Sequence, residues 1–438
     1  MNVCVIGTGY VGLVTGACFA EFGLQVICVD KDTDKVAALR RGEIPIYEPG
    51  LEDVVARNVR AGRLSFTVDA APAVRSSLVV LIAVPTPSRP DGGTDLSSIE
   101  AVAREIGRNL DGYKVVVTKS TVPVGSAERA RDWIQDELAK AGRDVRFSMA
   151  SNPEFLREGA AIGDFMRPDR VVIGIDPGDD HAAAILKDLY RPLFLNETPI
   201  VITDIASAEL AKYAANAFLA TKISFINEVA NLCEATGADV QAIARVMGLD
   251  RRIGSKFLHA GPGFGGSCFP KDTRSLARFA RERSGSFEIV EAVIRVNESQ
   301  RRRMVDKLVA ILDGSVQGKT IGVLGLSFKP ETDDVRDAPA LDIIRALQER
   351  GAEIRAFDPA AMPVARRELP GITLCDDSYS ACDGADALAI VTEWNEFRML
   401  DLDRVKQLLR RPVIVDLRNI YDPASVRRAG FVYTSVGR

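Results

Sequence analysis

A strand-like run at the start of the chain leads directly into a glycine-rich turn, and this order constrains the fold most. Residues 3–6 are apolar, and Gly7, Gly9 and Gly12 follow with G-x-G-x-x-G spacing before a helical pattern. Such glycines let the backbone approach a pyrophosphate at a helix N-terminus. Asp30 ends the next strand, 23 residues after Gly7. The spacing therefore predicts dinucleotide binding; the alternative is a tight turn that binds nothing.

The charge of Asp30 favours NAD over NADP. A carboxylate at this strand end accepts hydrogen bonds from both ribose hydroxyls but repels a 2'-phosphate. Lys31 and Lys35 are close enough in sequence to weaken this preference. Thr86 and Thr121 each follow a later strand, where sheets of this type expose ligand-binding groups. Either threonine alone is more often a helix cap or a turn residue.

Short apolar runs alternate with helical patterns over most of the chain. The first series has strand-like runs at 3–6, 26–29, 78–84, 115–118 and 171–175, and a second series runs from 318 to 416. Alternation of this kind predicts parallel, doubly wound sheets. We therefore expect an α/β protein with two Rossmann-like domains, residues 1–203 and 311–438, joined by a helical domain at 204–310. Asp358 is predicted to end a second strand, as Asp30 does.

A long helix is predicted from Asp204 to Thr236, ending before Gly237. Its length of about 50 Å exceeds what one small domain needs. Its apolar face from residue 218 to 226 has no obvious cover within the chain, which predicts a homodimer. Lys212 and Asn216 lie four residues apart on one face with apolar neighbours, so both need polar partners.

Composition excludes several classes of protein. The chain has 438 residues, 47% of them hydrophobic, and a net charge of −4, which does not suit a broad nucleic-acid surface. Its apolar runs are too short to span a membrane, and the N-terminus lacks a signal-peptide pattern. Seven scattered cysteines without metal-type pairs favour reduced thiols, no metal site and a cytoplasmic location.

The segment 261–272 places a thiol beside a cation and a carboxylate. Cys268 follows a glycine-rich stretch and precedes Lys271 and Asp272. Because the thiolate is the nucleophile, a nearby lysine favours the reactive form of Cys268. The alternative is a buried structural cysteine. Glu154 lies in a rigid Asn-Pro-Glu turn, and its alternative is a turn carboxylate with no role.

Six motifs in one order resemble a known family. They are GTGYVG at the start, IYEPGLE at 46–52, KSTVPVG at 119–125, NPEFLREG at 152–159, AKYAANAFLATKISFINE at 211–228 and FGGSCFPKD at 264–272. The chain resembles the nucleotide-sugar 6-dehydrogenases of the UDP-glucose/GDP-mannose dehydrogenase family. The resemblance implies oxidation of UDP-glucose to UDP-glucuronate with two NAD molecules, through a thiohemiacetal and a thioester on Cys268.

The resemblance also implies roles for individual residues. Lys212 and Asn216 stabilise an oxyanion, Asp272 transfers a proton with Thr121 through a water, and Glu154 activates the hydrolytic water. The cofactor contacts that it implies are Gly7, Gly9, Tyr10, Val11, Gly12, Asp30, Lys35, Thr86, Thr121, Glu158, Lys271 and Arg336. The substrate contacts that it implies are Glu154, Phe155, Leu156, Lys212, Asn216, Arg252, Phe257, Leu258, His259, Gly265, Lys329 and Arg418.

Two further expectations concern partners and alternatives. The resemblance implies that Arg252 reaches the substrate site of a neighbouring subunit in the homodimer. Within the family, the alternative substrates are GDP-mannose and UDP-N-acetylhexosamines. The alternative from another class is a regulator that binds NAD or nucleotide sugar without turnover. The joint presence of Cys268, Lys212, Asp272 and Glu154 argues against such a regulator.

Overall fold

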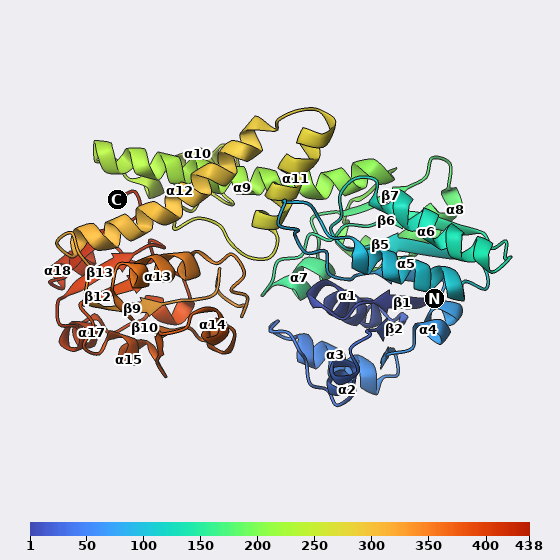
Figure 1. The fold of residues 1–438 in the computed structure, drawn as a ribbon, viewed down its shortest axis with the longest axis horizontal. Coiled ribbons are helices and arrows are strands. Elements are labelled where there is room, and N and C mark those ends of the chain that lie inside the picture. Colours follow the sequence, from blue (N-terminus) through green and yellow to red (C-terminus); the bar gives the residue numbers. More distant parts are fainter. The chain divides into compact units, whose positions relative to one another are not determined.

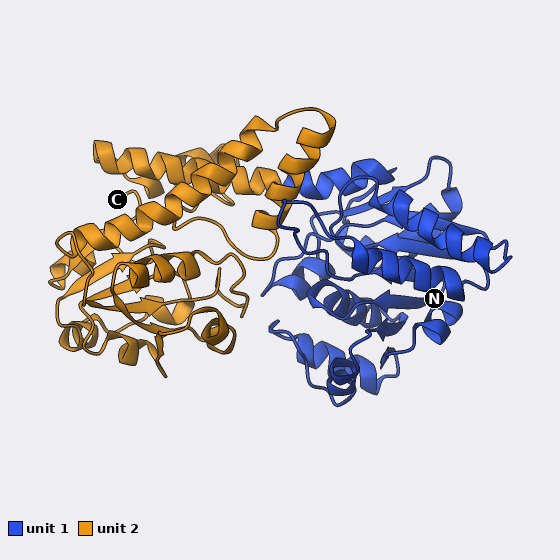
Figure 2. Ribbon diagram, in the orientation of Figure 1, with its two compact units in different colours: residues 1–215 blue, residues 216–438 orange.

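The computed structural model describes residues 1–438, which form two compact units (Figure 2). Unit 1 comprises residues 1–215 and unit 2 comprises residues 216–438. The boundary lies within helix α9 (Ile205–Thr236), the predicted long helix. The division into three domains at 203/204 and 310/311 stays a prediction.

Unit 1 contains an eight-stranded sheet whose first six positions have the doubly wound order 3-2-1-4-5-6. Across the sheet (Figure 1), the strands are β3 (Leu64–Thr67), β2 (Gln25–Val29), β1 (Asn2–Ile6), β4 (Val79–Ile82), β5 (Lys114–Thr118), β6 (Phe147–Ser151), β7 (Val171–Ile175) and β8 (Ile200–Asp204). The predicted α/β class and doubly wound topology are confirmed.

One pairing differs from the expected parallel sheet. β7 pairs antiparallel with β6, through Ala150 opposite Ile175 and Ser151 opposite Gly174. A parallel neighbour needs a crossover to the opposite end of the sheet. The segment 152–170 contains only the short helix α7 (Ala161–Met166) and makes no such crossover, so the chain direction reverses. β7 and β8 are again parallel to each other.

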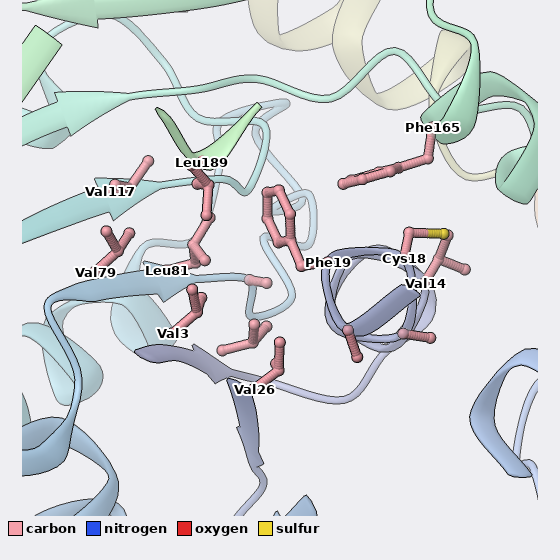
Figure 3. Packing of buried hydrophobic residues seen from close by; sticks show 14 of the residues in the cluster. Val3, Val14, Cys18, Phe19, Val26, Val79, Leu81, Val117, Phe165 and Leu189 are labelled. Atoms are coloured by element: carbon pink, nitrogen blue, oxygen red, sulfur yellow. The ribbon is translucent and has the colours of Figure 1, made fainter. Parts of the chain in front are cut away.

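Helices cover both faces of this sheet because alternate residues of its strands point to opposite faces. Val3 and Val5 of β1 belong to one buried cluster, whereas Cys4 and Ile6 belong to another. Figure 3 shows the first cluster, with Phe19 beside valines of the strands. The remaining helical segments of unit 1 are α1 (Tyr10–Glu21), α2 (Thr33–Arg40), α3 (Leu51–Arg60), α4 (Ala70–Ser76), α5 (Ser97–Asn109), α6 (Ser126–Lys140), α8 (Asp180–Leu189) and the 3-10 helix η1 (Arg191–Asn196).

Unit 2 contains a six-stranded, wholly parallel sheet with the same order of strands. The strands across it are β11 (Thr373–Leu374), β10 (Glu353–Phe357), β9 (Thr320–Leu324), β12 (Ala387–Ile390), β13 (Val413–Asp416) and β14 (Val432–Ser435). Its helices besides α9 are α10 (Val240–Leu249), α11 (Phe269–Arg283), α12 (Glu288–Ile311), α13 (Pro339–Glu349), α14 (Met362–Glu368), α15 (Ser378–Cys382), α16 (Asn395–Arg398), α17 (Leu402–Leu408) and α18 (Pro423–Arg428). The predicted repeat of one nucleotide-binding topology is therefore confirmed.

Helix α9 begins at Ile205, one residue later than predicted, because Asp204 ends β8. The predicted uncovered face from residue 218 to 226 is partly wrong, since Ile226 is fully buried. Within that range Phe218 and Phe225 are 66% and 53% exposed, and beyond it Leu232 is 62% exposed. Their spacing of seven places them in one stripe along the helix. No helix in the chain has both the length and the apolar character of a membrane span.

Candidate active site

The glycine turn after β1 is closely packed against the backbone at two of its three glycines. Gly7 has a φ of 105°, and a Cβ there would lie 2.4 Å from the carbonyl oxygen of Ala83. A Cβ at Gly12 would lie 2.0 Å from the carbonyl oxygen of Gly7, so both positions require glycine. A Cβ at Gly9 would contact nothing within 4 Å. Gly9 also caps α1 without a side-chain hydrogen bond, which suits an anion at this helix end.

Asp30 lies beside this turn. Its Oδ2 accepts hydrogen bonds from the backbone N–H and the hydroxyl of Thr8, at 2.9 Å and 2.6 Å. The ammonium group of Lys35 is 3.2 Å from the same oxygen. Burial acts to raise the pKa of Asp30, but the hydrogen bonds from Thr8 and Asp32 and the charge of Lys35 outweigh it, and the pKa is lowered. Asp30 is thus held as a carboxylate.

Thr86 and Thr121 come together after strands β4 and β5. The hydroxyl of Thr86 donates to the carbonyl of Thr121 at 2.9 Å, although the residues are 35 positions apart. Ser120 donates to the carbonyl of Val84 at 2.7 Å. The two threonine-bearing loops are therefore bonded to each other at the carboxyl end of the sheet, where ligands of doubly wound sheets bind.

Glu48 links the glycine turn to the NPEFLREG segment, and the sequence analysis assigned it no role. Its carboxylate accepts the hydroxyl of Tyr10 and the backbone N–H groups of Gly159 and Ala161, the latter two at 2.6 Å and 2.8 Å. Leu156 and Glu158, both partly buried, precede Gly159. Glu48 belongs to the IYEPGLE motif, which pointed to this segment but not to the hydrogen-bond partners of Glu48.

A buried ion pair joins two predicted catalytic residues. The ammonium group of Lys212 lies 3.2 Å from Oε1 of Glu154. Oε2 of Glu154 accepts the backbone N–H of Leu156 at 2.6 Å. Phe155 lies between Glu154 and Leu156 in the sequence. Its ring centroid is 5.2 Å from the Lys212 ammonium and 3.6 Å from the Arg170 guanidinium. The polar partner that α9 was expected to need at Lys212 is therefore Glu154.

A second lysine, Lys119, is buried nearby and was not predicted. Its ammonium group donates to Oδ1 of Asn152 at 2.9 Å and to the hydroxyl of Tyr190 at 3.2 Å. Burial lowers the pKa of Lys119 to about 7, the charge of Glu154 opposes this shift, and the charge of Lys212 adds to it. The KSTVPVG motif contains Lys119, but a lysine at a strand end is ordinarily exposed and gave no reason to single it out.

Cys268 differs from the other six cysteines of the chain in its exposure. They are buried, whereas Cys268 is partly exposed and occupies the N-cap of α11. Burial raises the pKa of both Cys18 and Cys28 to about 12, which makes them poor nucleophiles. The Sγ of Cys268 is 3.5 Å from the hydroxyl of Ser267.

Asp272 lies one turn after Cys268 and is fully buried. Its Oδ2 accepts a hydrogen bond from Asn216 at 2.6 Å, and its Oδ1 accepts one from Lys271 at 2.6 Å. Its backbone N–H donates to the carbonyl of Cys268 at 2.8 Å. Within unit 2, Asn216, Lys271 and Asp272 therefore form one bonded group next to Cys268. The effect of Lys271 on the thiol stays a prediction.

The predicted substrate residues of unit 2, and the predicted cofactor residue Arg336, occupy varied settings. Arg418 donates to the carbonyls of Val391 and Phe328 at 2.7 Å and 3.0 Å. Arg336 is exposed and paired with Asp334. Leu258 and Gly265 are buried, Phe257 and Lys329 are partly buried, and His259 is exposed.

Arg252 is the most exposed of the predicted cationic contacts, with a side-chain exposure of 89%, and its guanidinium is 2.6 Å from Asp250. Arg418, in contrast, is partly buried and donates a hydrogen bond to the carbonyl of Val391, directly after β12. Arg252 thus pairs with the partly exposed Asp250.

The glycine turn after β1 of a doubly wound sheet, with Asp30 directly after β2, is typical of nicotinamide-dependent dehydrogenases. Sequence models of the UDP-glucose/GDP-mannose dehydrogenase family match the chain in three parts: the NAD binding domain at residues 1–194, the central domain at 206–299 and the UDP binding domain at 322–423. The chain belongs to this family, as its motifs predicted, and its cofactor is NAD.

Individual relatives cover nearly the whole chain. The UDP-glucose 6-dehydrogenase of Rhizobium meliloti (strain 1021) is 54% identical over 439 aligned residues, covering 100% of both chains. The structure of a UDP-glucose dehydrogenase from Pyrobaculum islandicum matches with a TM-score of 0.90 and 42% identity, covering 99% of this chain and 96% of that one. A UDP-D-ManNAc dehydrogenase from Pyrococcus horikoshii gives a TM-score of 0.87 at 27% identity, covering 100% and 99%.

Proposed function

We propose that this enzyme oxidises UDP-glucose to UDP-glucuronate in two successive NAD-dependent steps. The position of Cys268 carries the proposal, because a partly exposed thiol at the N-terminus of α11 suits capture of an aldehyde. The relatives support UDP-glucose over other sugar nucleotides. The enzyme that acts on UDP-glucose is 54% identical, whereas the UDP-D-ManNAc enzyme is 27% identical.

The residues of the chain account for the covalent steps. NAD, when bound, accepts a hydride in each of the two oxidations. After the first, the Cys268 thiolate adds to the aldehyde carbon, and protonation of the resulting oxyanion gives a thiohemiacetal. Loss of the hydroxyl proton and of the second hydride leaves a thioester, whose carbon–sulfur bond breaks when water adds. The products are the carboxylate and the free thiol. The tether keeps the aldehyde in place between the two oxidations.

We assign proton transfers to the buried carboxylates. Glu154 takes a proton from the hydrolytic water, and Asp272 exchanges a proton through a water with Thr121. Lys212 and Asn216 stabilise the oxyanion of each tetrahedral intermediate. The buried pair Lys212–Glu154 and the buried bond Asn216–Asp272 support these roles, since they hold the four side chains in fixed positions.

The predicted cofactor and substrate contacts keep their roles in this proposal. The glycine turn, Asp30 and Thr86 bind NAD together with Lys35, Glu158, Lys271 and Arg336. The UDP-sugar is bound by Phe155, Leu156, Phe257, Leu258, His259, Gly265, Lys329 and Arg418. Arginine and lysine supply charge and directed donors to a pyrophosphate.

We further propose a homodimer that works in the cytoplasm. The exposed stripe of Phe218, Phe225 and Leu232 on α9 supports a second copy as the partner, because the heptad spacing suits packing against another helix. The exposure of Arg252 supports its role in the partner's substrate site. All seven cysteines are free thiols, which fits a reducing compartment.

The stoichiometry of NADH tests the function. Purified enzyme with excess NAD is expected to form two NADH for each UDP-glucose consumed, and less product from GDP-mannose or UDP-N-acetylhexosamines at equal concentration. Cys268→Ser abolishes formation of the acid, whereas the buried Cys233→Ala retains it. Release of free aldehyde with one NADH contradicts the covalent route. Absence of any NADH from UDP-glucose favours the non-catalytic regulator.

A further inference from the structure

The segment from Gly261 to Cys268, here the cysteine loop, lies between α10 and α11 and has no regular secondary structure. Four of its eight residues are glycine, Gly261, Gly263, Gly265 and Gly266. Glycine-rich chain has many accessible conformations, and fixing it costs conformational entropy. The position of the Cys268 thiol therefore depends on contacts from outside the loop.

Asn297 of α12 binds the middle of the cysteine loop through both atoms of its carboxamide. Its Oδ1 accepts the backbone N–H of Phe264 at 2.8 Å, and its Nδ2 donates to the carbonyl of the same residue at 3.0 Å. Asn297 is 6% exposed. Gly263 has a φ of 107°, and a Cβ there would lie 2.6 Å from Oδ1 of Asn297. The loop is thus shaped for this close approach.

Two further carboxamides bind the start of the loop. The backbone N–H of Gly261 donates to Oδ1 of Asn227 at 2.9 Å, and the carbonyl of Gly261 accepts from Nε2 of Gln300 at 2.9 Å. Asn231 donates to Oε1 of Gln300 at 3.2 Å, which orients that amide. Asn227 and Gln300 are both buried. Each backbone group of Gly261 therefore has a side-chain partner.

Asn227 and Asn231 belong to α9, whereas the remaining contacts come from one face of α12. Asn297, Gln300 and Arg301 occupy positions i, i+3 and i+4, which lie side by side on a helix. Nη2 of Arg301 donates to the carbonyl of Phe264 at 2.6 Å and to the carbonyl of Asp337 at 2.8 Å. The same face therefore holds the cysteine loop and ties it to the segment before α13.

We propose that Asn297 and Gln300, with Asn227, are positioning residues that set the Cys268 thiol for capture of the aldehyde. The inference rests on the proposed nucleophilic role of Cys268. None of the three residues reacts with the substrate. They act because attack on a carbonyl requires a near-attack geometry, and a displacement of about 1 Å costs on the order of a hundredfold in rate.

The inference predicts an effect on one half of the reaction. The first hydride transfer precedes attack by the thiol, whereas the second requires the thiohemiacetal. Asn297→Ala and Gln300→Met are therefore expected to slow the second NADH at least tenfold relative to the first. Affinity for UDP-glucose should stay within threefold of wild type. Arg302→Ala, at an exposed position of the same helix, is the control. It should leave the ratio of the second NADH rate to the first unchanged.

A single-turnover experiment, with enzyme and NAD in excess over UDP-glucose, follows NADH by stopped-flow absorbance. The first phase is formation of the first NADH, and the second phase is formation of the second. Thermal melting shows which variants are folded. If only one of the two variants folds, the result for that variant decides the outcome. A selective slowing of the second phase supports the inference. An unchanged ratio, or an equal loss of amplitude in both phases, overturns it and leaves the three amides a purely structural role. Two NADH in the wild-type trace test the proposed function separately.

Discussion

The ammonium group of Lys212 lies 3.2 Å from the carboxylate of Glu154, and their side chains are only 4% and 5% exposed. These residues are 58 positions apart in the chain. Each charge is compensated by the other, and neither has enough contact with water to replace its partner. Loss of either partner would therefore leave the other charge buried without its ion-pair partner.

Breaking this pair from either side is expected to destabilise the protein. Glu154→Gln and Lys212→Met should each lower the free energy of unfolding by about 3–5 kcal/mol, because one buried charge loses its ion-pair partner. The double variant should lose less free energy of unfolding than the two single variants lose in sum. Urea unfolding of all four proteins measures the coupling. The same cycle on the exposed pair Arg41 and Glu43 should give no measurable coupling, and additive losses at Lys212 and Glu154 would show that the pair is not formed.

Lys119 should make stability depend on pH. Its pKa is about 7 in the folded protein because of burial, and about 10.4 when the chain is unfolded. Between these values the unfolded state binds a proton that the folded state does not, so stability rises with pH, by at most about 1.4 kcal/mol per pH unit. Below pH 7 both states are protonated and this contribution is constant.

Lys119→Met removes this dependence. The unfolding free energy of wild type minus that of the variant should therefore increase from pH 7 to pH 9, as measured by denaturant unfolding at several pH values. Tyr190, Glu154 and Lys212 face Lys119 and are unchanged in the variant. Lys187→Met, at an exposed position, serves as the control. Parallel pH curves for wild type and Lys119→Met would mean that Lys119 stays charged in the folded state.

The carboxylate of Asp30 should set the choice of cofactor. The enzyme is expected to have a higher kcat/KM for NAD than for NADP, because the carboxylate repels a 2'-phosphate. Asp30→Ala should narrow this ratio at least tenfold and weaken NAD binding. The exposed Asp34→Ala is the matched control. Steady-state kinetics with both cofactors test this. Equal values in the wild type would show that Lys35, which is 3.2 Å away, neutralises Asp30.

The exposed stripe on α9 should be required for the dimer. Phe225→Glu places a charge among the apolar side chains of Phe218 and Leu232 and should give monomers by sedimentation velocity. Met399→Glu introduces the same charge at a residue that is 83% exposed but outside the stripe, and it should remain a dimer. If Phe225→Glu sediments as wild type does, the stripe is not the interface.

Mixed subunits test whether Arg252 acts in the partner's site. Cys268→Ser and Arg252→Ala are each expected to be inactive. A heterodimer of the two contains one site with an intact Cys268 and the partner's Arg252, so mixing should restore one working site per dimer. Activity after exchange of tagged subunits measures this. No recovery, with exchange verified by the tags, would place the action of Arg252 within its own subunit.

The sequence alone determined features that rest on local patterns. The strand before Gly7, the spacing to Asp30 and the stop of α9 before Gly237 follow from periodicity and from the conformational freedom of glycine. The motif around Cys268 likewise predicted a thiol after a glycine-rich stretch and next to Lys271 and Asp272 in the chain. These features depend only on neighbours along the chain, which is why the predictions agree with the structure.

The tertiary structure alone decided which distant residues meet. Nothing in the sequence indicates that Lys119 donates to Tyr190, 71 residues later, or that Asn297 binds both backbone groups of Phe264. The antiparallel pairing of β7 and the burial of Ile226 were also missed. Such contacts leave no periodic trace, because each polar group is satisfied by whichever partner the packed fold brings within hydrogen-bond distance.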